Sequence, residues 1–117
     1  MYRQEAQGLE RLESSEFREL AGQLALGQDL AADASVNVYF LADLDRVLNA
    51  YGNRGYRAVQ LEAAIQAGRM YLAAYAQRLG ATGLTFFDDA VIRFFSPQAE
   101  GMSVMFLIAL GKKARRR

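Results

Sequence analysis

Arginine, carboxylate and tyrosine side chains are the groups with which this sequence could do chemistry. It contains no cysteine and no histidine, which excludes thiolate nucleophiles, disulfides, Cys/His zinc sites and serine–histidine relays. Its only lysines are Lys112 and Lys113, so an internal Schiff-base lysine and the lysine of a phosphate-binding P-loop have no candidate. No side chain can be nominated as a general acid or base, and any redox chemistry would have to come from a cofactor.

The strongest charge feature is a basic tail at residues 112–117. Its basic residues are Lys112, Lys113, Arg115, Arg116 and Arg117. The chain has 14 basic and 13 acidic groups, so residues 1–111 keep nine basic groups against 13 acidic ones, a net charge of −4. An acidic body makes a broad nucleic-acid-binding face an unfavoured interpretation, whereas the tail alone could bind a phosphate group. A solvated tail and a nonspecific nucleic-acid contact are the alternatives.

Two further groups of polar residues have a simple structural interpretation. Tyr51, Arg54, Tyr56 and Arg57 surround one glycine-containing loop and could line a substrate pocket. Tyrosines at the rim of a core, with arginines paired to Asp43, Asp45 or solvent, explain them more simply. Asp88 and Asp89 precede an apolar run and are expected to cap a helix.

Hydrophobic periodicity gives the elements that would position these residues. We expect a hairpin around Gly8, a helix that begins after Ser14 and Ser15 and ends near Gly27, a strand at 36–41, a short helix from Asp43, a long helix at 56–79, an extended segment at 81–87, a helix through residues 90–95 that Pro97 ends, and a central strand at 102–110. The strand at 36–41 is apolar on both faces and is expected to be buried.

The long helix is apolar over most of its circumference. One seam consists of Leu61, Ile65, Gly68, Leu72, Tyr75 and Leu79, and a second seam of Ala63, Ala67, Met70 and Ala74. We expect the surrounding 117-residue chain to cover only part of such a helix, so a partner surface is implied. The seam of small residues is expected to allow another helix to approach closely.

Length and composition indicate one domain at residues 1–111 followed by the tail at 112–117. The sequence is 117 residues long and 52% hydrophobic, within the range of ordinary globular domains. Its longest apolar run is about half the length of a membrane-spanning helix, and its N-terminus lacks the apolar region of a secretory signal. We therefore predict a cytoplasmic protein with no membrane partner.

Six motifs, in order and in register, resemble one known family. They are Gly8-Leu9-Glu10-Arg11-Leu12, Ala25-Leu26-Gly27-Gln28, Tyr51-Gly52-Asn53-Arg54-Gly55-Tyr56-Arg57, Leu61-Glu62-Ala63, Met70-Tyr71-Leu72-Ala73-Ala74 and Phe87-Asp88-Asp89. This order is similar to the SagB-type dehydrogenase branch of the FMN-dependent nitroreductase superfamily. The resemblance covers the whole chain but only the C-terminal part of the family domain, without its N-terminal helices and arginine-rich flavin-binding segment.

The resemblance implies a fold and a cofactor site. The fold is α+β, with a mixed, largely antiparallel sheet packed on a long central helix that lies in the core of a dimer. Backbone N–H groups near the flavin ring would come from Gly83, Leu84, Thr85 and Phe86, and the FMN phosphate would bind to Lys112, Lys113 and Arg115. The family usually has two glycines where Thr85 and Phe86 stand, so either the loop turns Phe86 away or the ring does not bind in the usual way.

Two positions in the long helix also depart from the family. Ala64-Ile65 and Gly68-Arg69 stand where this branch commonly has Gly-His and Gln-Asn. The leading hypothesis is nevertheless an FMN-dependent oxidoreductase module, active as a homodimer or with a complementary chain, that takes hydride from NAD(P)H or an organic substrate. The alternative is a flavin-free, non-catalytic interaction subunit that keeps the dimerising helix. A nucleic-acid contact through the tail ranks third.

Overall fold

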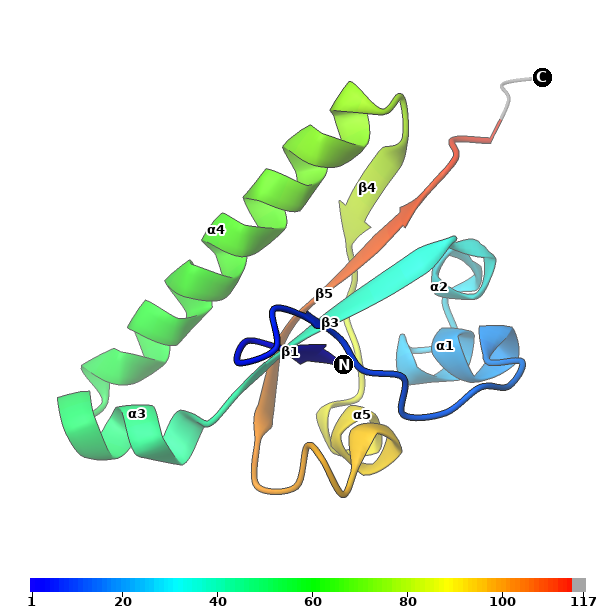
Figure 1. Ribbon diagram of the computed structural model, residues 1–117. Helices are drawn as coiled ribbons and strands as arrows, with labels where there is room; N and C mark the ends of the chain where they lie inside the picture. Colours follow the sequence, from blue (N-terminus) through cyan, green and yellow to red (C-terminus); the bar gives the residue numbers. More distant parts are fainter. Residues whose placement is uncertain (115–117) are drawn as a thin grey trace.

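A three-stranded antiparallel sheet forms the centre of the computed structural model, which describes residues 1–114 (Figure 1). Its strands are β3 (Val36–Ala42), β5 (Ser103–Gly111) and β4 (Gly80–Gly83), in that order across the sheet. The register of β3 on β5 shifts between Phe40 and Leu41, where the strand has an irregularity. The α+β class expected from the resemblance is confirmed.

β5 is the central strand, as its apolar sequence predicts. Its buried residues are Val104, Met105, Leu107, Ile108 and Ala109. β3, by contrast, lies at the edge of the described sheet, and Val36 at its start is 51% exposed. The expectation that this strand is buried is therefore wrong, since its other six residues are only partly buried. An apolar sequence reports which faces are covered and not how many neighbouring strands are present.

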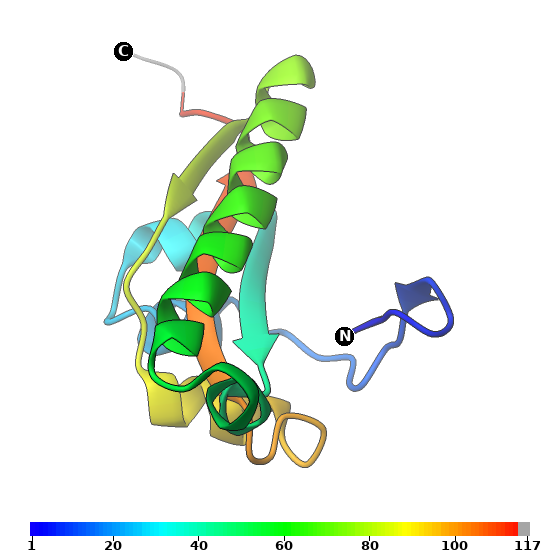
Figure 2. The ribbon, with the colours of Figure 1, turned by 90° about the vertical axis from the view of Figure 1, so that its left-hand side faces the viewer.

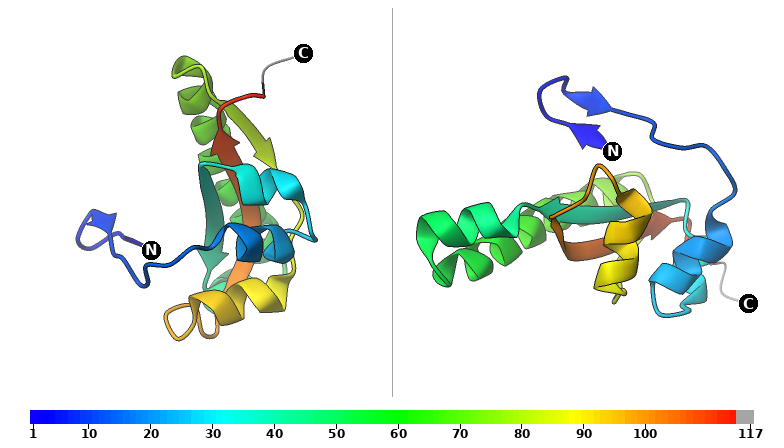
Figure 3. Two further views of the ribbon diagram at one scale, coloured as in Figure 1. Left: turned by 90° about the vertical axis from the view of Figure 1, so that its right-hand side faces the viewer. Right: turned by 90° about the horizontal axis from the view of Figure 1, so that it is seen from below.

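Helices cover both faces of the sheet. α4 (Arg54–Ala76) lies on one face, with α3 (Leu44–Tyr51) packed beside it, and it stands in front of the sheet in Figure 2. α1 (Arg18–Leu24) and α2 (Asp29–Asp33) lie on the other face, as the opposite view in Figure 3 shows. α5 (Asp88–Phe95) belongs to that same side, because its Val91 packs with Leu24 and Val104 in one buried cluster.

α4 is one unbroken helix whose small residues face the sheet. Ala63, Ala67 and Ala74 are buried, and the helix packs on β4 and β5. At its start, a Cβ on Gly55 would lie 2.9 Å from Val47 Cγ1, so α3 and α4 touch where no side chain fits. The seam of small residues thus serves close packing on the chain's own sheet, which corrects the expectation that another helix approaches it.

The helix termini follow the sequence in one case and depart from it in others. Asp43 caps α3, because its Oδ1 accepts a hydrogen bond from the backbone N–H of Arg46 at 3.2 Å. Asp88 and Asp89 do not cap α5: Phe87 holds the N-cap position, and the two aspartates lie in the first turn, where the helix dipole favours them. Ser14 and Ser15 likewise precede α1 without capping it, and the short helix α2 was not expected.

The N-terminal hairpin stands apart from the sheet (Figures 2 and 3). It pairs β1 (Tyr2–Arg3) with β2 (Gly8–Leu9) and is closed by an ion pair of 2.6 Å between Arg3 Nε and Glu10 Oε2. Leu9 of β2 is 85% exposed. The hairpin is therefore held by its own hydrogen bonds rather than by burial.

Candidate functional site

The loop that follows β4 is held at both ends by backbone hydrogen bonds. The N–H of Leu84 donates to the carbonyl of Leu107 at 3.0 Å, and the N–H of Phe87 donates to the carbonyl of Leu24, at the end of α1, at 2.9 Å. Gly83 lies directly against an aromatic ring, since a Cβ there would be 2.8 Å from Phe106 Cζ. Gly83, just before the loop, therefore has no room for a side chain. The loop of residues 84–87 is hydrogen-bonded at its first and its last residue.

Phe86 turns its ring into the protein. The ring packs against both buried clusters on the α1–α2–α5 side of the sheet, one formed by Leu24, Val91 and Val104 and the other by Ala25, Ala31 and Leu107. Of the two outcomes left open by the sequence, the structure has the first: the loop turns Phe86 away from its outer surface. The bulk that replaces a family glycine at this position is therefore placed in the core.

Thr85 is exposed, and its polar atoms face the turn between α1 and α2. Gln28 Nε2 lies 3.3 Å from Thr85 Oγ1 and 3.4 Å from the Thr85 carbonyl oxygen. The N–H groups of Thr85 and Phe86 themselves donate no hydrogen bond within residues 1–114. The loop thus presents two adjacent unpaired backbone donors, the kind of group that binds an anionic or carbonyl-rich ligand.

The predicted phosphate-binding lysines lie at the opposite end of β4. Lys113 reaches over Gly80, the first residue of β4, and its Nζ is 5.7 Å from the centre of the Tyr75 ring in α4. Thr85 is five positions after Gly80, a distance of roughly 17 Å in an extended strand. Lys112 is exposed, and Arg115 lies outside the described residues. The two halves of the predicted site are thus not in contact but lie at the two ends of one edge strand.

The outer face of α4 carries large apolar side chains that residues 1–114 leave largely exposed. Leu61 is 62% exposed, Ile65 44%, Leu72 71% and Tyr75 51%. We call these four residues the open face. They are four of the six residues of the first seam predicted from the sequence, and they leave large apolar side chains exposed along the helix.

Comparisons with known proteins decide the family. The model of the nitroreductase family matches residues 2–112. The chain belongs to the nitroreductase family. A crystal structure from Anabaena variabilis, described as that of a "putative nitroreductase", matches this chain with a TM-score of 0.89 and 32% sequence identity. The match covers 97% of this chain and 23% of that one, so this chain spans about a quarter of the solved protein. A search of curated proteins gives no match.

Other candidate residues of this nitroreductase-family chain do not converge on a site. The ion pairs within residues 1–114 are Arg3–Glu10 and Arg18–Glu16, so Arg54 and Arg57 form none with Asp43 or Asp45. Tyr56 accepts a hydrogen bond from Gln60 on the same helix at 3.2 Å. These residues lie at the start of α4, at the far end of the helix from Lys113, and the substrate-pocket interpretation gains no support.

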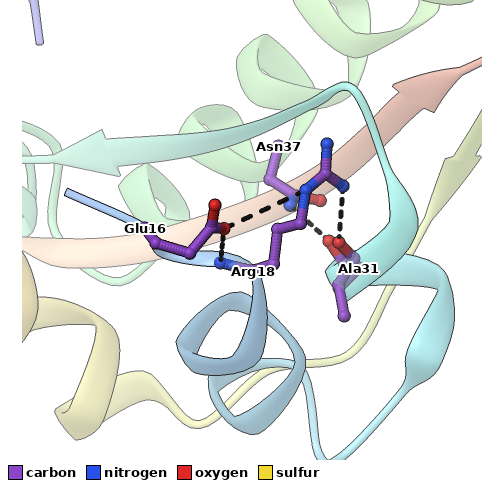
Figure 4. A network of polar contacts seen from close by, with 5 residues as sticks. Glu16, Arg18, Ala31 and Asn37 are labelled. Carbon is purple, nitrogen blue, oxygen red and sulfur yellow. Dashed lines mark hydrogen bonds and ion pairs between the residues drawn. The ribbon is translucent and has the colours of Figure 1, made fainter. Parts of the chain in front are cut away.

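A polar network fixes α2 beside the loop (Figure 4). Asn37 Nδ2 donates to the Ala31 carbonyl at 2.7 Å, and Arg18 Nη1 donates to the Ala32 carbonyl at 3.0 Å. Both acceptors are carbonyls near the end of α2, which lack partners within so short a helix. A shallow cavity of about 310 Å³ lies against this network. The network holds the segment that carries Gln28.

Two remaining features lie near the loop or behind it. A second shallow cavity, about 450 Å³, begins at Phe87 and is lined by Phe87, Asp88, Asp89, Ala90 and Arg93. On the α1–α2–α5 side of the sheet, burial raises the pKa of Tyr39, whose hydroxyl finds no partner among the described residues. Within residues 1–114 no group of acidic side chains is arranged to hold a metal ion, and no helix is long and apolar enough to cross a bilayer.

Gln28 is the residue that sequence reasoning did not connect with the site. Its motif, Ala25–Gln28, is one of the six that carry the family resemblance, but Gln28 and Thr85 are 57 positions apart. The turn itself has an unusual backbone, with φ of 59° at Leu26 and 73° at Gly27. A glycine followed by a glutamine after a helix was the available signal, but it could not predict what the side chain would touch.

Proposed function

We propose that this chain is a SagB-type, FMN-dependent oxidoreductase module of the nitroreductase family. The single observation that carries the proposal is the pair of unpaired N–H groups at Thr85 and Phe86, on the loop to which the family resemblance assigns contact with the flavin ring. The Phe86 ring packs on the buried clusters and the Thr85 hydroxyl lies beside Gln28, so both side chains are held on the protein side of the loop. The residues of the loop therefore fit a flat ring placed beside the backbone.

Each end of β4 has a separate task in this proposal. The N–H groups of Thr85 and Phe86 would hold the polar edge of the ring and stabilise negative charge that develops there. Lys112, Lys113 and Arg115 would hold the phosphate by charge-assisted hydrogen bonds. When bound, FMN accepts and donates hydride, so the protein supplies position and electrostatics rather than a reacting side chain.

The module is proposed to act with a second chain. The open face of α4 offers four large apolar side chains to a partner, either a second copy or a complementary chain of the same family. Burial of a leucine or isoleucine side chain contributes about 1.5–3 kcal/mol, so a face of this size can support association. Lys113 Nζ lies 5.7 Å from the ring centre of Tyr75 in the open face, which supports a phosphate site next to the proposed partner surface.

The direct test is a visible absorption spectrum of the purified 117-residue chain after incubation with FMN and removal of unbound FMN. Retained yellow colour, with saturable binding, is the expected result. A chain that stays colourless counts against the proposal. The matched variant is Lys112→Ala/Lys113→Ala, which should weaken FMN affinity by about tenfold or more, because each charge-assisted contact contributes roughly 1.5–3 kcal/mol. Its binding of riboflavin, which lacks the phosphate, should equal that of the unaltered chain.

The alternative is a flavin-free interaction subunit built on the same fold. The observation that favours it is the open face itself, which is exposed without any ligand and needs only a partner chain. It predicts a stable dimer that binds no FMN under any condition. Sedimentation of the FMN-free chain separates the two ideas when it is combined with the absorption spectrum.

A further inference from the structure

We infer that Gln28 is a positioning residue, which keeps the N–H groups of Thr85 and Phe86 turned toward the ligand side of the loop. The inference rests on the proposed function, because it assigns the task of this side chain to the same cofactor loop. It concerns a residue that makes contact with the loop from another part of the fold and is not itself placed against the cofactor.

The contacts of Gln28 connect two segments that are otherwise separate in the chain. Its Nε2 donates to the Ala25 carbonyl at 2.8 Å and lies 3.3 Å from Thr85 Oγ1 and 3.4 Å from the Thr85 carbonyl. The short contact with Ala25 fixes the amide within its own turn, and the two longer contacts reach the loop. The Thr85 carbonyl and the Phe86 N–H belong to one trans peptide unit and point in opposite directions, so the contact of the amide with that carbonyl turns the Phe86 N–H away from Gln28.

The rest of the turn holds the loop from the other side of Thr85. The Leu24 carbonyl accepts the N–H of Phe87, and the Phe86 ring packs on Leu24 and Ala25. Thr85 is thus held through its hydroxyl and carbonyl, Phe86 through its ring and Phe87 through its backbone N–H. Of these contacts, only that of Gln28 with Thr85 is made by a side chain that can be shortened without leaving a cavity in the core.

The turn is itself rigidly placed. Arg18 and Asn37 bind the carbonyls near the end of α2, the helix that begins directly after Gln28. Leu26 has a positive φ of 59°, a conformation that a leucine rarely adopts without support from its surroundings. A supported turn can orient a side chain accurately, which is what a positioning residue requires.

The experiment compares Gln28→Ala with Gln66→Ala, a control whose amide donates only to Glu62 on the exposed side of α4. In the full chain without FMN, the backbone order parameter of Thr85, from ¹⁵N relaxation, should fall from about 0.85 toward 0.6 in Gln28→Ala and stay unchanged in the control. With FMN, Gln28→Ala should weaken binding about fivefold and change the reduction potential of the bound flavin, with little change in thermal midpoint.

A double-mutant cycle with Thr85→Val isolates the contact. The effect of Gln28→Ala on FMN affinity should shrink in the Thr85→Val background and persist in the Thr85→Ser background, which keeps the hydroxyl. If Gln28→Ala lowers the stability of the fold, Gln28→Glu, which keeps the length but lacks the N–H donors, replaces it.

The outcomes separate this inference from the proposed function. The inference is overturned, even when FMN binds, if Gln28→Ala leaves the order parameter of Thr85 unchanged. It is also overturned if Gln28→Ala weakens FMN binding equally in the unaltered, Thr85→Val and Thr85→Ser chains. If the unaltered chain binds no FMN, the proposed function fails, and the order parameter alone decides whether Gln28 holds the loop.

Discussion

Helix α4 carries small residues on its buried side and large apolar residues on its exposed side, the reverse of most surface helices. Small side chains, Ala63, Ala67 and Ala74, are buried against the sheet, whereas large apolar ones, such as Leu61 and Leu72, face outward. A surface helix ordinarily buries its large residues and exposes polar ones. The difference teaches that this helix packs closely on its own sheet through small residues and leaves its large apolar side chains exposed, which is the basis of the proposed contact with a partner.

The largest expected effect comes from a charge on the open face. Leu72→Asp should convert an associated chain into a monomer or an insoluble product, with self-association weakened by about 100-fold or more, because burial of an unpaired carboxylate costs several kcal/mol. Sedimentation equilibrium measures the change. Ala73→Asp is the control, since it places the same charge one residue along the helix, at an exposed position outside the open face. A Leu72→Asp chain that stayed dimeric would show that the open face is not the interface.

An enlarged residue on the opposite side should affect folding rather than association. Ala67 is 2% exposed, so Ala67→Leu forces three extra carbon atoms between α4 and the sheet. We expect a loss of about 2–3 kcal/mol in the free energy of unfolding, measured by urea denaturation. Ala64→Leu, on an exposed position of the same helix, should change this free energy by less than about 0.5 kcal/mol. Equal tolerance of both variants would contradict the division of the helix into a packed and an open side.

The smallest effect concerns Tyr39, on the side of the sheet that packs against α1, α2 and α5. Burial raises the pKa of Tyr39 above its ordinary value of 10.0, so the folded state holds this proton more tightly than the unfolded state does. The contribution to stability is intact below pH 10.0 and is lost as the pH rises through the raised pKa of the folded state. Tyr39→Phe should therefore lose less stability than the unaltered chain between pH 9 and pH 11.

At neutral pH the same substitution should change the free energy of unfolding by only about 1 kcal/mol or less, because the hydroxyl it removes has no partner within residues 1–114. Thermal midpoints across the pH series measure both effects. Tyr2→Phe, in the exposed hairpin, is the matched control. If the two variants had the same alkaline profile, Tyr39 would not titrate as a buried group.

Much of the fold followed from patterns along the chain. The period of α4 predicted one unbroken helix with two apolar seams, and the continuous apolar run of β5 predicted a central strand. Both are long elements with regular burial, where the pattern averages over many residues. Local signals were less dependable: Asp43 caps its helix, but Asp88 does not, because a capping residue is also suitable for the first turn.

The candidate site was predictable only in part. The family resemblance placed Gly83, Leu84, Thr85 and Phe86 in one loop and the lysines after the last strand, but it left the direction of Phe86 undecided. Whether a ring turns inward depends on the space that α1, α2 and α5 leave above β5, and no local pattern encodes that space. The contact between Gln28 and Thr85 could not be predicted for the same reason.

By itself the sequence determined which chemistry is excluded, because absent cysteine and histidine cannot be supplied by any fold, and it determined the long elements through their hydrophobic period. Tertiary structure alone decided which seam of α4 packs on the sheet, where Phe86 points and which residue reaches Thr85. These outcomes depend on contacts between segments far apart in the chain, and such contacts are set by the strand order and by competition for limited space in the core.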